Sequence, residues 1–500
     1  MEEKNGEITK DVGAVEATVE PADIESTEEA SSKTYSKLAT VAMVVFSGLA
    51  IGSDAFNVSI VGQIELILAI LYPDALTTSM YGRLSNAFMI GMIFGMIGFG
   101  YLSDKIGRKS GAVMTTIILT VGIAMSAGAS GNTPTGLLWM LVISRGIAGV
   151  GAGGEYPVAG AGAAEATDET GSGQKNRGFI FAIIADTLPC LGFVFSGIVP
   201  ILLILCFHQD PAHYDKVWRI SLALAAIPPL SIFWFRYKMV VSTAYKKSAM
   251  KKQRVPYLLA FKKYWRNVLS AGLTWGLYNY VAYPFGLFSS TIISQLGIGD
   301  SMIKNLGWGA VINCFYIPGS LMGGLLSDRI GRRKTMTIGF LSQAVLGFIL
   351  GGLFFKIEPI TPLFIVFYGI FLTLGELGPG ATVVIVASES FPTSIRGQGM
   401  GLAAAMSKAG GAIGTSVFKP ILAHWGDDSM KGTQAVFLIG SAFSCVGAAV
   451  AFFMVPDVDK RLGSEDEVWK RYLEDHGYEI EWGTKGGEEE DKEAEKVVKS

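Results

Sequence analysis

The feature of this sequence that most constrains its fold is a series of long apolar runs that fills most of the chain. An α-helix needs about 20 residues to cross the hydrocarbon of a bilayer. Runs of that length begin near residues 38, 80, 110, 137, 178 and 217, and again near 267, 306, 335, 362, 397 and 434. Only 17% of the 500 residues are charged, whereas soluble domains carry about 25%. We therefore expect an all-α membrane protein with twelve transmembrane helices in two six-helix halves.

Charged residues gather outside these runs and suggest how the chain is divided. We expect 1–36 to be a disordered tail, 37–239 and 267–455 to be the two halves, 240–266 to be a linker loop and 456–500 to be an acidic tail. Lys and Arg concentrate in the loops after even-numbered runs. The positive-inside rule then places both termini and the linker in the cytoplasm, and we expect a multi-pass protein of the plasma membrane.

One ten-residue motif occurs twice, just after the second run and just after the eighth. The copies read GYLSDKIGRK at 100–109 and GLLSDRIGRR at 324–333. A motif repeated at matching places in two halves indicates an internally duplicated transporter. It resembles the signature loop of the major facilitator superfamily, whose members use it as a cytoplasmic gate. The resemblance implies gating roles for Asp104, Arg108, Asp328 and Arg332.

Four acidic residues interrupt the apolar runs, where an ionisable group costs about 2.5–3.5 kcal/mol at mid-membrane and is a functional candidate. They are Asp54, Glu155, Asp186 and Glu376. Every histidine lies in a loop or in the tail, so proton transport would depend on carboxylates. A structural role is the alternative for each acid, and for Asp186 and Glu376 it is the interpretation that we prefer.

Lys408 is the cation in the middle of the eleventh run, where Gly410 and Gly411 leave space for a ligand. A buried lysine without a partner would lose its proton or require a carboxylate. We therefore expect Lys408 to bind an anionic substrate. Pairing of Glu155 with Lys408, or with Arg145, remains the structural alternative.

Aromatic and polar residues follow one face of the seventh run. Trp275, Asn279 and Tyr283 recur every four residues and share a helical stripe, with Tyr278 beside it. Aromatic stripes commonly serve packing or lie at the membrane interface. The polar Asn279 in the middle of the stripe favours the lining of a substrate pocket instead.

Together these motifs resemble the phosphate:proton symporters and, more closely, the fungal glycerophosphodiester transporters. The most specific are SDAF at 53–56, GGEYP at 153–157, GPG at 378–380 and SKAG at 407–410. The resemblance implies that Asp54 and Glu155 handle protons. It also implies that a phosphate group is bound by Tyr156, Trp275, Tyr283 and Lys408.

Two departures from the phosphate symporters favour a larger substrate: Gly380 replaces their Asn, and no Gln follows Gly178, where Asp186 and Leu188 occupy the corresponding stretch. In a third departure, Asn279 replaces their Asp, which removes a charge that would repel an anion. Losing two phosphate ligands would enlarge the pocket and suit a phosphate ester with a bulky headgroup. The sugar-porter motifs expected after the sixth and twelfth runs are missing, which argues against a sugar substrate.

The sequence thus predicts proton-coupled uptake of a glycerophosphodiester, of the glycerophosphoinositol or glycerophosphocholine type, by alternating access. The alternatives are an inorganic phosphate symporter, a polyol or organic-anion carrier, and a transporter-like nutrient sensor. We expect no enzyme activity, cofactor or metal, because no nucleophile–base pair or metal-ligand spacing occurs. The expected partners are the anionic phosphodiester, protons and lipid, with no nucleic acid, and we expect a monomer.

Overall fold

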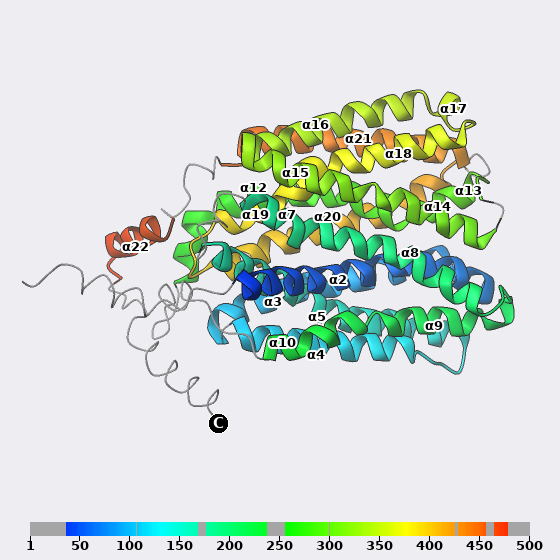
Figure 1. Cartoon of the computed structure of the whole chain (residues 1–500), viewed down its shortest axis with the longest axis horizontal. Coiled ribbons are helices and arrows are strands. Elements are labelled where there is room, and N and C mark those ends of the chain that lie inside the picture. Colours follow the sequence, from blue (N-terminus) through cyan, green and yellow to red (C-terminus); the bar gives the residue numbers. More distant parts are fainter. Residues whose placement is uncertain are drawn as a thin grey trace, which may run out of the picture.

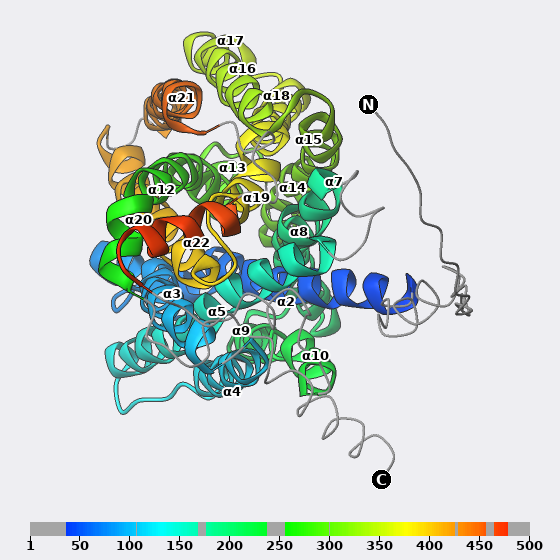
Figure 2. The ribbon, with the colours of Figure 1, turned by 90° about the vertical axis from the view of Figure 1, so that its left-hand side faces the viewer.

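The computed structural model describes residues 37–106, 108–168, 177–237, 256–299, 301–425, 429–456 and 465–478. Within these residues the chain is helical and has no strand. The helices run along the long axis of the bundle, with those of the first half on one side and those of the second half on the other (Figures 1 and 2). The predicted N-terminal tail, and most of the predicted linker and C-terminal tail, lie outside the described residues.

Twelve helical segments follow the predicted order. In the first half they are α2 (Lys37–Leu71), α3 (Thr78–Ile106), α4 (Arg108–Ala127), α5 (Pro134–Asp168), α7–η1–α8 (Arg177–Ala182, Ile183–Thr187, Leu188–Cys206) and α9–α10 (Tyr214–Leu224, Ile227–Tyr237). In the second half they are α12 (Tyr257–Leu287), α14–α15 (Met302–Cys314, Tyr316–Ile330), α16 (Arg332–Gly352), α18–η3–α19 (Thr361–Gly375, Glu376–Gly380, Ala381–Glu389), α20 (Arg396–Ala423) and α21 (Ser429–Met454). Short helices η2 (Pro211–His213), α13 (Ser289–Gln295) and α17 (Phe354–Ile357) lie in the connections, and α22 (Glu465–Asp475) follows the bundle.

Ten of these segments are long and apolar enough to cross a membrane by length and composition. The two others are α12 and α20, which carry five of the six predicted substrate residues, all but Tyr156 of α5. These two helices pack on each other, and a Cβ at Gly410 would lie only 2.2 Å from the carbonyl oxygen of Gly276. Glycine at this crossing lets the two backbones approach closely. Polar residues on them can therefore face protein instead of lipid.

Two spans contain a π-helical turn, η1 in the first half and η3 in the second. Such single turns inside α-helices are frequent at functional sites. Asp186 lies in η1, and Glu376 lies in η3 together with Pro379. Gly378, Pro379 and Gly380 all lie in the turn η3.

At the α22 end of the bundle, the second copy of the repeated motif binds the first half. Asp328 accepts hydrogen bonds from the backbone N–H groups of Gly178 (2.8 Å) and Phe179 (2.9 Å), which begin α7. Arg332 lies 3.6 Å from Asp328, the pairing that the motif predicts. Glu389 lies 3.0 Å from Arg177 and 3.5 Å from Arg332. These contacts form the α22-end closure; the side chains of Asp104 and Arg108 lie outside the described residues.

The opposite end is also closed by contacts between the halves. Lys419 of α20 lies 2.7 Å from Glu65 of α2, and Asn86 of α3 donates to Ser416 Oγ at 2.7 Å. Ser290 donates to Gln63 Oε1 at 2.8 Å. The first helix continues to Leu71 and so includes the buried Glu65. Within the described residues, contacts between the halves therefore close both ends of the bundle, which is the arrangement of an occluded conformation.

Candidate functional site

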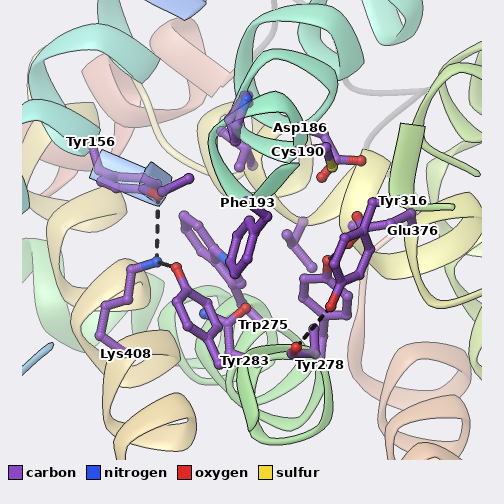
Figure 3. Close-up of a pocket in the computed structure, with 18 residues that line it drawn as sticks. Tyr156, Asp186, Cys190, Phe193, Trp275, Tyr278, Tyr283, Tyr316, Glu376 and Lys408 are labelled. Atoms are coloured by element: carbon purple, nitrogen blue, oxygen red, sulfur yellow. Dashed lines mark hydrogen bonds between the residues drawn. The ribbon is translucent and has the colours of Figure 1, made fainter. Parts of the chain in front are cut away.

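A cavity of about 60 Å³ lies between the two halves. That volume holds only a few water molecules, as expected for an occluded conformation. Its walls come from the first half through α2, α5, η1 and α8, and from the second half through α12, α15, η3, α19 and α20. Figure 3 shows a basic end around Lys408 and an acidic end around Asp186 and Glu376.

Lys408 forms the basic end of the cavity. Its ammonium group donates hydrogen bonds to the phenol oxygens of Tyr283 and, at 3.4 Å, Tyr156 (Figure 3). It also lies 4.5 Å and 4.6 Å from the centroids of those two rings, within cation–π range. Lys408 is 2% exposed and makes no ion pair within the described residues. The carboxylate of Asp54 is its electrostatic neighbour.

The helical stripe of α12 forms the floor between the two ends. Asn279 donates to Ser407 Oγ at 3.2 Å, which links α12 to the residue preceding Lys408. The Trp275 ring lies 6.2 Å from that of Tyr156. Tyr283 packs edge-on against Phe193 at 5.9 Å. The stripe is therefore buried and lines the cavity, as the polar residue in its middle predicts.

The acidic end is formed by Asp186, Cys190 and Glu376, whose oxygen and sulfur atoms lie within 4.8 Å of one another. Tyr278 donates a hydrogen bond to Glu376 Oε1. Gly380 supports this cluster, because a Cβ there would lie 1.9 Å from Glu376 Oε2. The structure thus brings together, from the two halves, two acids that the sequence treats as separate.

All six predicted substrate residues line this one cavity: Tyr156, Trp275, Tyr278, Asn279, Tyr283 and Lys408. The predicted proton residues Asp54 and Glu155 are buried beside it, each next in sequence to a lining residue, but neither lines it. Their roles remain predictions. Leu188, expected near the pocket, instead packs against Gly48 and Gly52 of α2.

The alternative pairings of Glu155 are not present within the described residues. Lys408 bonds to the two tyrosines, and Arg145 donates to the carbonyl oxygen of Asn57 and lies 4.6 Å from the Phe88 ring. Arg145 is 1% exposed, so it is buried as deeply as Lys408.

Some lining residues could not be found from sequence. Phe193 and Tyr316 belong to ordinary apolar runs and carry no distinguishing signal. Asp186 and Glu376 did carry one, since each is a charge inside a span. The sequence does not indicate that these two acids lie close to each other.

A bundle of twelve helical segments with a polar cavity between its halves has the architecture of a multi-pass membrane transporter, and the family and relatives that the chain matches indicate a transporter and not an enzyme. The sugar (and other) transporter family matches residues 13–252 and 237–462, and the chain belongs to this family. The structure of the major facilitator superfamily proton:xylose symporter XylE bound to 6-bromo-6-deoxy-D-glucose superposes with a TM-score of 0.71 at 16% identity. The match covers 86% of this chain and 98% of XylE, and it confirms the predicted fold.

Relatives with higher sequence identity have names that specify a substrate. Glycerophosphoinositol permease 1 of Candida albicans is 38% identical over 461 residues, 91% of this chain and 86% of the permease. Glycerophosphocholine permease GIT4 of the same organism is 34% identical over 440 residues, 87% of this chain and 82% of the permease. The resemblance to fungal glycerophosphodiester transporters is thereby confirmed.

Proposed function

We propose that this transporter takes up a glycerophosphodiester, of the glycerophosphoinositol or glycerophosphocholine type, together with protons across the plasma membrane. The names of its relatives support the substrate class. The positive-inside bias supports cytoplasmic termini, so the α22 end would face the cytoplasm. Alternating access would proceed by opening one end at a time around the closed cavity.

The observation that carries the proposal is the environment of Lys408. Its ammonium is removed from water, held by two phenols, and has no carboxylate in an ion pair within the described residues. A desolvated cation of this kind is stabilised by an anionic ligand. A phosphodiester carries one negative charge and would accept hydrogen bonds from the ammonium and both tyrosines.

The two-ended cavity favours a diester over inorganic phosphate. A free phosphate would occupy only the basic end, leaving the polar groups around Tyr278 and Tyr316 without a ligand. A second phosphate charge would also be repelled by the two acids of the opposite end. A headgroup attached to the phosphate could reach that end once the two halves move apart and the cavity widens.

Uptake competition in a transporter-deficient strain tests the proposal. Radiolabelled glycerophosphoinositol or glycerophosphocholine should accumulate, and unlabelled diesters should compete while phosphate competes poorly. Accumulation should fall when a protonophore dissipates the gradient. Equal competition by phosphate would identify a phosphate symporter, and signalling without accumulation would identify a nutrient sensor.

A further inference from the structure

We propose that Asp186 and Glu376 share one proton across the boundary between the two halves, and that this proton stabilises the occluded conformation. The proposal rests on the proton-coupled transport inferred above, but it assigns a proton site that is separate from Asp54 and Glu155. It also replaces the structural role that the sequence favours for these two acids.

The two carboxyl groups come from opposite halves. Asp186 lies on η1, within the fifth span, and Glu376 lies on η3, within the tenth. Their exposed fractions are 7% and 4%, and both line the cavity (Figure 3). Next to Asp186, the hydroxyl of Thr187 is hydrogen-bonded to that of Ser320 on α15. The turn η1 is therefore joined directly to the second half.

Hydrogen bonding leaves one oxygen of each acid unsatisfied. Glu376 Oε1 accepts from Tyr278, whereas Glu376 Oε2 and Asp186 Oδ2 have no hydrogen-bond partner within the described residues. Buried polar atoms in this state are uncommon and costly. A proton held by one carboxyl can be donated to the other, and this single O–H···O bond would satisfy both atoms.

Electrostatic repulsion between the two carboxyl groups also requires that one of them holds a proton. Two ionised carboxylates this close in a water-poor site repel each other strongly, and one is then driven to remain protonated. Neither acid makes an ion pair within the described part of the chain. The titratable groups that interact with one or both of them are uncharged when protonated: Cys190 of α8, Tyr278 and Tyr283 of α12, Tyr316 of α15 and Tyr156 of α5.

Charged groups on the remaining neighbouring helices are engaged elsewhere. Asp54 of α2 is the electrostatic neighbour of Lys408 on α20, at the other end of the cavity. Arg177 of α7 and Arg332 of α16 lie against Glu389 of α19. Tyr368 of α18 donates to the carbonyl oxygen of Phe285. A proton is therefore the positive charge that this site can acquire from solvent.

Because Asp186 and Glu376 come from opposite halves, proton binding by this pair is linked to the movement of the halves relative to each other. When the halves separate at either end, the two carboxyl groups can part and each can be hydrated and ionised. Closure brings them together and requires one proton. A ligand that binds one conformation more tightly shifts the equilibrium towards it, so the proton favours occlusion. Uptake should then decline as external pH rises, because fewer transporters can close.

The test uses Asp186→Asn and Glu376→Gln in the full-length protein, because a neutral amide can donate to the remaining carboxylate and permit closure without a proton. For each variant, we expect the fall of uptake with rising pH to flatten and accumulation against a gradient to drop at least tenfold. Counterflow exchange, which needs no net proton movement, should decline less. Asp74→Asn, on an exposed loop, is the matched control and should keep the wild-type pH profile.

Infrared difference spectroscopy of the purified wild-type protein provides a second measurement that does not depend on active variants. A protonated-carboxyl band that disappears on raising the pH, and is absent from Glu376→Gln, supports the shared proton. If this band is absent from the wild-type protein at every pH at which the protein transports, the shared proton is disproved.

Other outcomes separate this inference from the proposed function. If wild type accumulates the diester with protons but both variants keep its pH profile and coupling, the shared proton is wrong and the function stands. A changed order of headgroup preference with coupling intact would assign the pair to substrate binding instead. Uptake abolished by chelators would assign it to a metal ion. If wild type transports no glycerophosphodiester, the proposed function itself fails.

Discussion

At the scale of single residues, the two ends of the cavity differ in the charge and the size of the side chains that form them. Lys408 offers a compact ammonium held by two phenol groups, and Glu376 occupies the space left by the missing side chain of Gly380. Each arrangement depends on the size as well as the charge of a residue. Substitutions at these positions therefore separate electrostatic from steric contributions.

We predict that Lys408→Ala reduces diester uptake at least about 30-fold, because removing one member of a buried charge pair costs about 2 kcal/mol or more. Lys408→Arg should recover little, since a planar guanidinium does not fit where a compact ammonium lies between two rings. Initial uptake rates normalised to surface expression are the measurement. The exposed Lys356→Ala is the control. Uptake by Lys408→Ala at unchanged affinity would contradict the assignment.

We predict that Gly380→Ala lowers uptake about tenfold, because an added Cβ would lie 1.9 Å from Glu376 Oε2 and 3.0 Å from the Tyr278 hydroxyl. Displacing packed groups in this way costs about 1–3 kcal/mol. Gly380→Asn, the residue of the phosphate symporters, should also displace Glu376 and should therefore impair uptake as well as narrowing the cavity. Competition curves with phosphate and with diesters measure both effects. Full activity of Gly380→Asn with unchanged selectivity would show that the cavity relaxes at this position.

At the scale of elements, the amphipathic helix α22 lies across one end of the bundle (Figure 2). Its Trp469 and Leu473 side chains are buried against the bundle. Asp466 accepts hydrogen bonds from the backbone N–H (2.6 Å) and hydroxyl (2.8 Å) of Thr393, in the turn between α19 and α20. The Trp469 ring lies 5.8 Å from that of Tyr264 on α12. All these partners belong to the second half, so these contacts attach α22 to that half.

We therefore predict that Trp469→Ala releases α22 from the bundle while transport continues. Truncating a buried tryptophan costs about 3–5 kcal/mol, so α22 loses a large part of the free energy that holds it on the bundle. Hydrogen exchange over residues 465–475 should become fast. Val468→Ala, at an exposed position of the same helix, is the matched control and should leave exchange unchanged. Slow exchange in Trp469→Ala would show that the polar contacts suffice.

At the scale of the whole molecule, the two closures oppose each other through the central cavity. The α22-end closure depends on Asp328 and Glu389, and the far end depends on Glu65 and Lys419. Hydrogen bonds to charged groups contribute about 1.5–3 kcal/mol each, so losing either closure should shift the population of conformations by roughly tenfold or more. The two losses should act in opposite directions.

Cys190 provides a reporter for this shift, because it lines the cavity whereas Cys206, Cys314 and Cys445 are exposed on the bundle surface. In a background with those three replaced by alanine, Lys419→Met should increase labelling of Cys190 by an impermeant thiol reagent added outside intact cells. Asp328→Ala should decrease it. Equal labelling of the two variants would argue against alternating closure of the two ends.

The sequence by itself determined the membrane fold, the span order and the repeated motif. These follow from local physics: apolar runs must cover a bilayer, and the motif places Arg332 four residues after Asp328, across the break at Gly331. It also determined that Trp275, Asn279 and Tyr283 share a face, because helical periodicity is a property of neighbouring residues.

Only the tertiary structure decided which residues meet across the two halves. Asp186 and Glu376 lie far apart in the chain, and nothing local to either one indicates that their carboxyl groups meet. Glu65 and Lys419 likewise lie in different halves, and nothing local to either one indicates that they form an ion pair. Such contacts depend on how two bundles pack, which no periodicity or composition within one segment can specify.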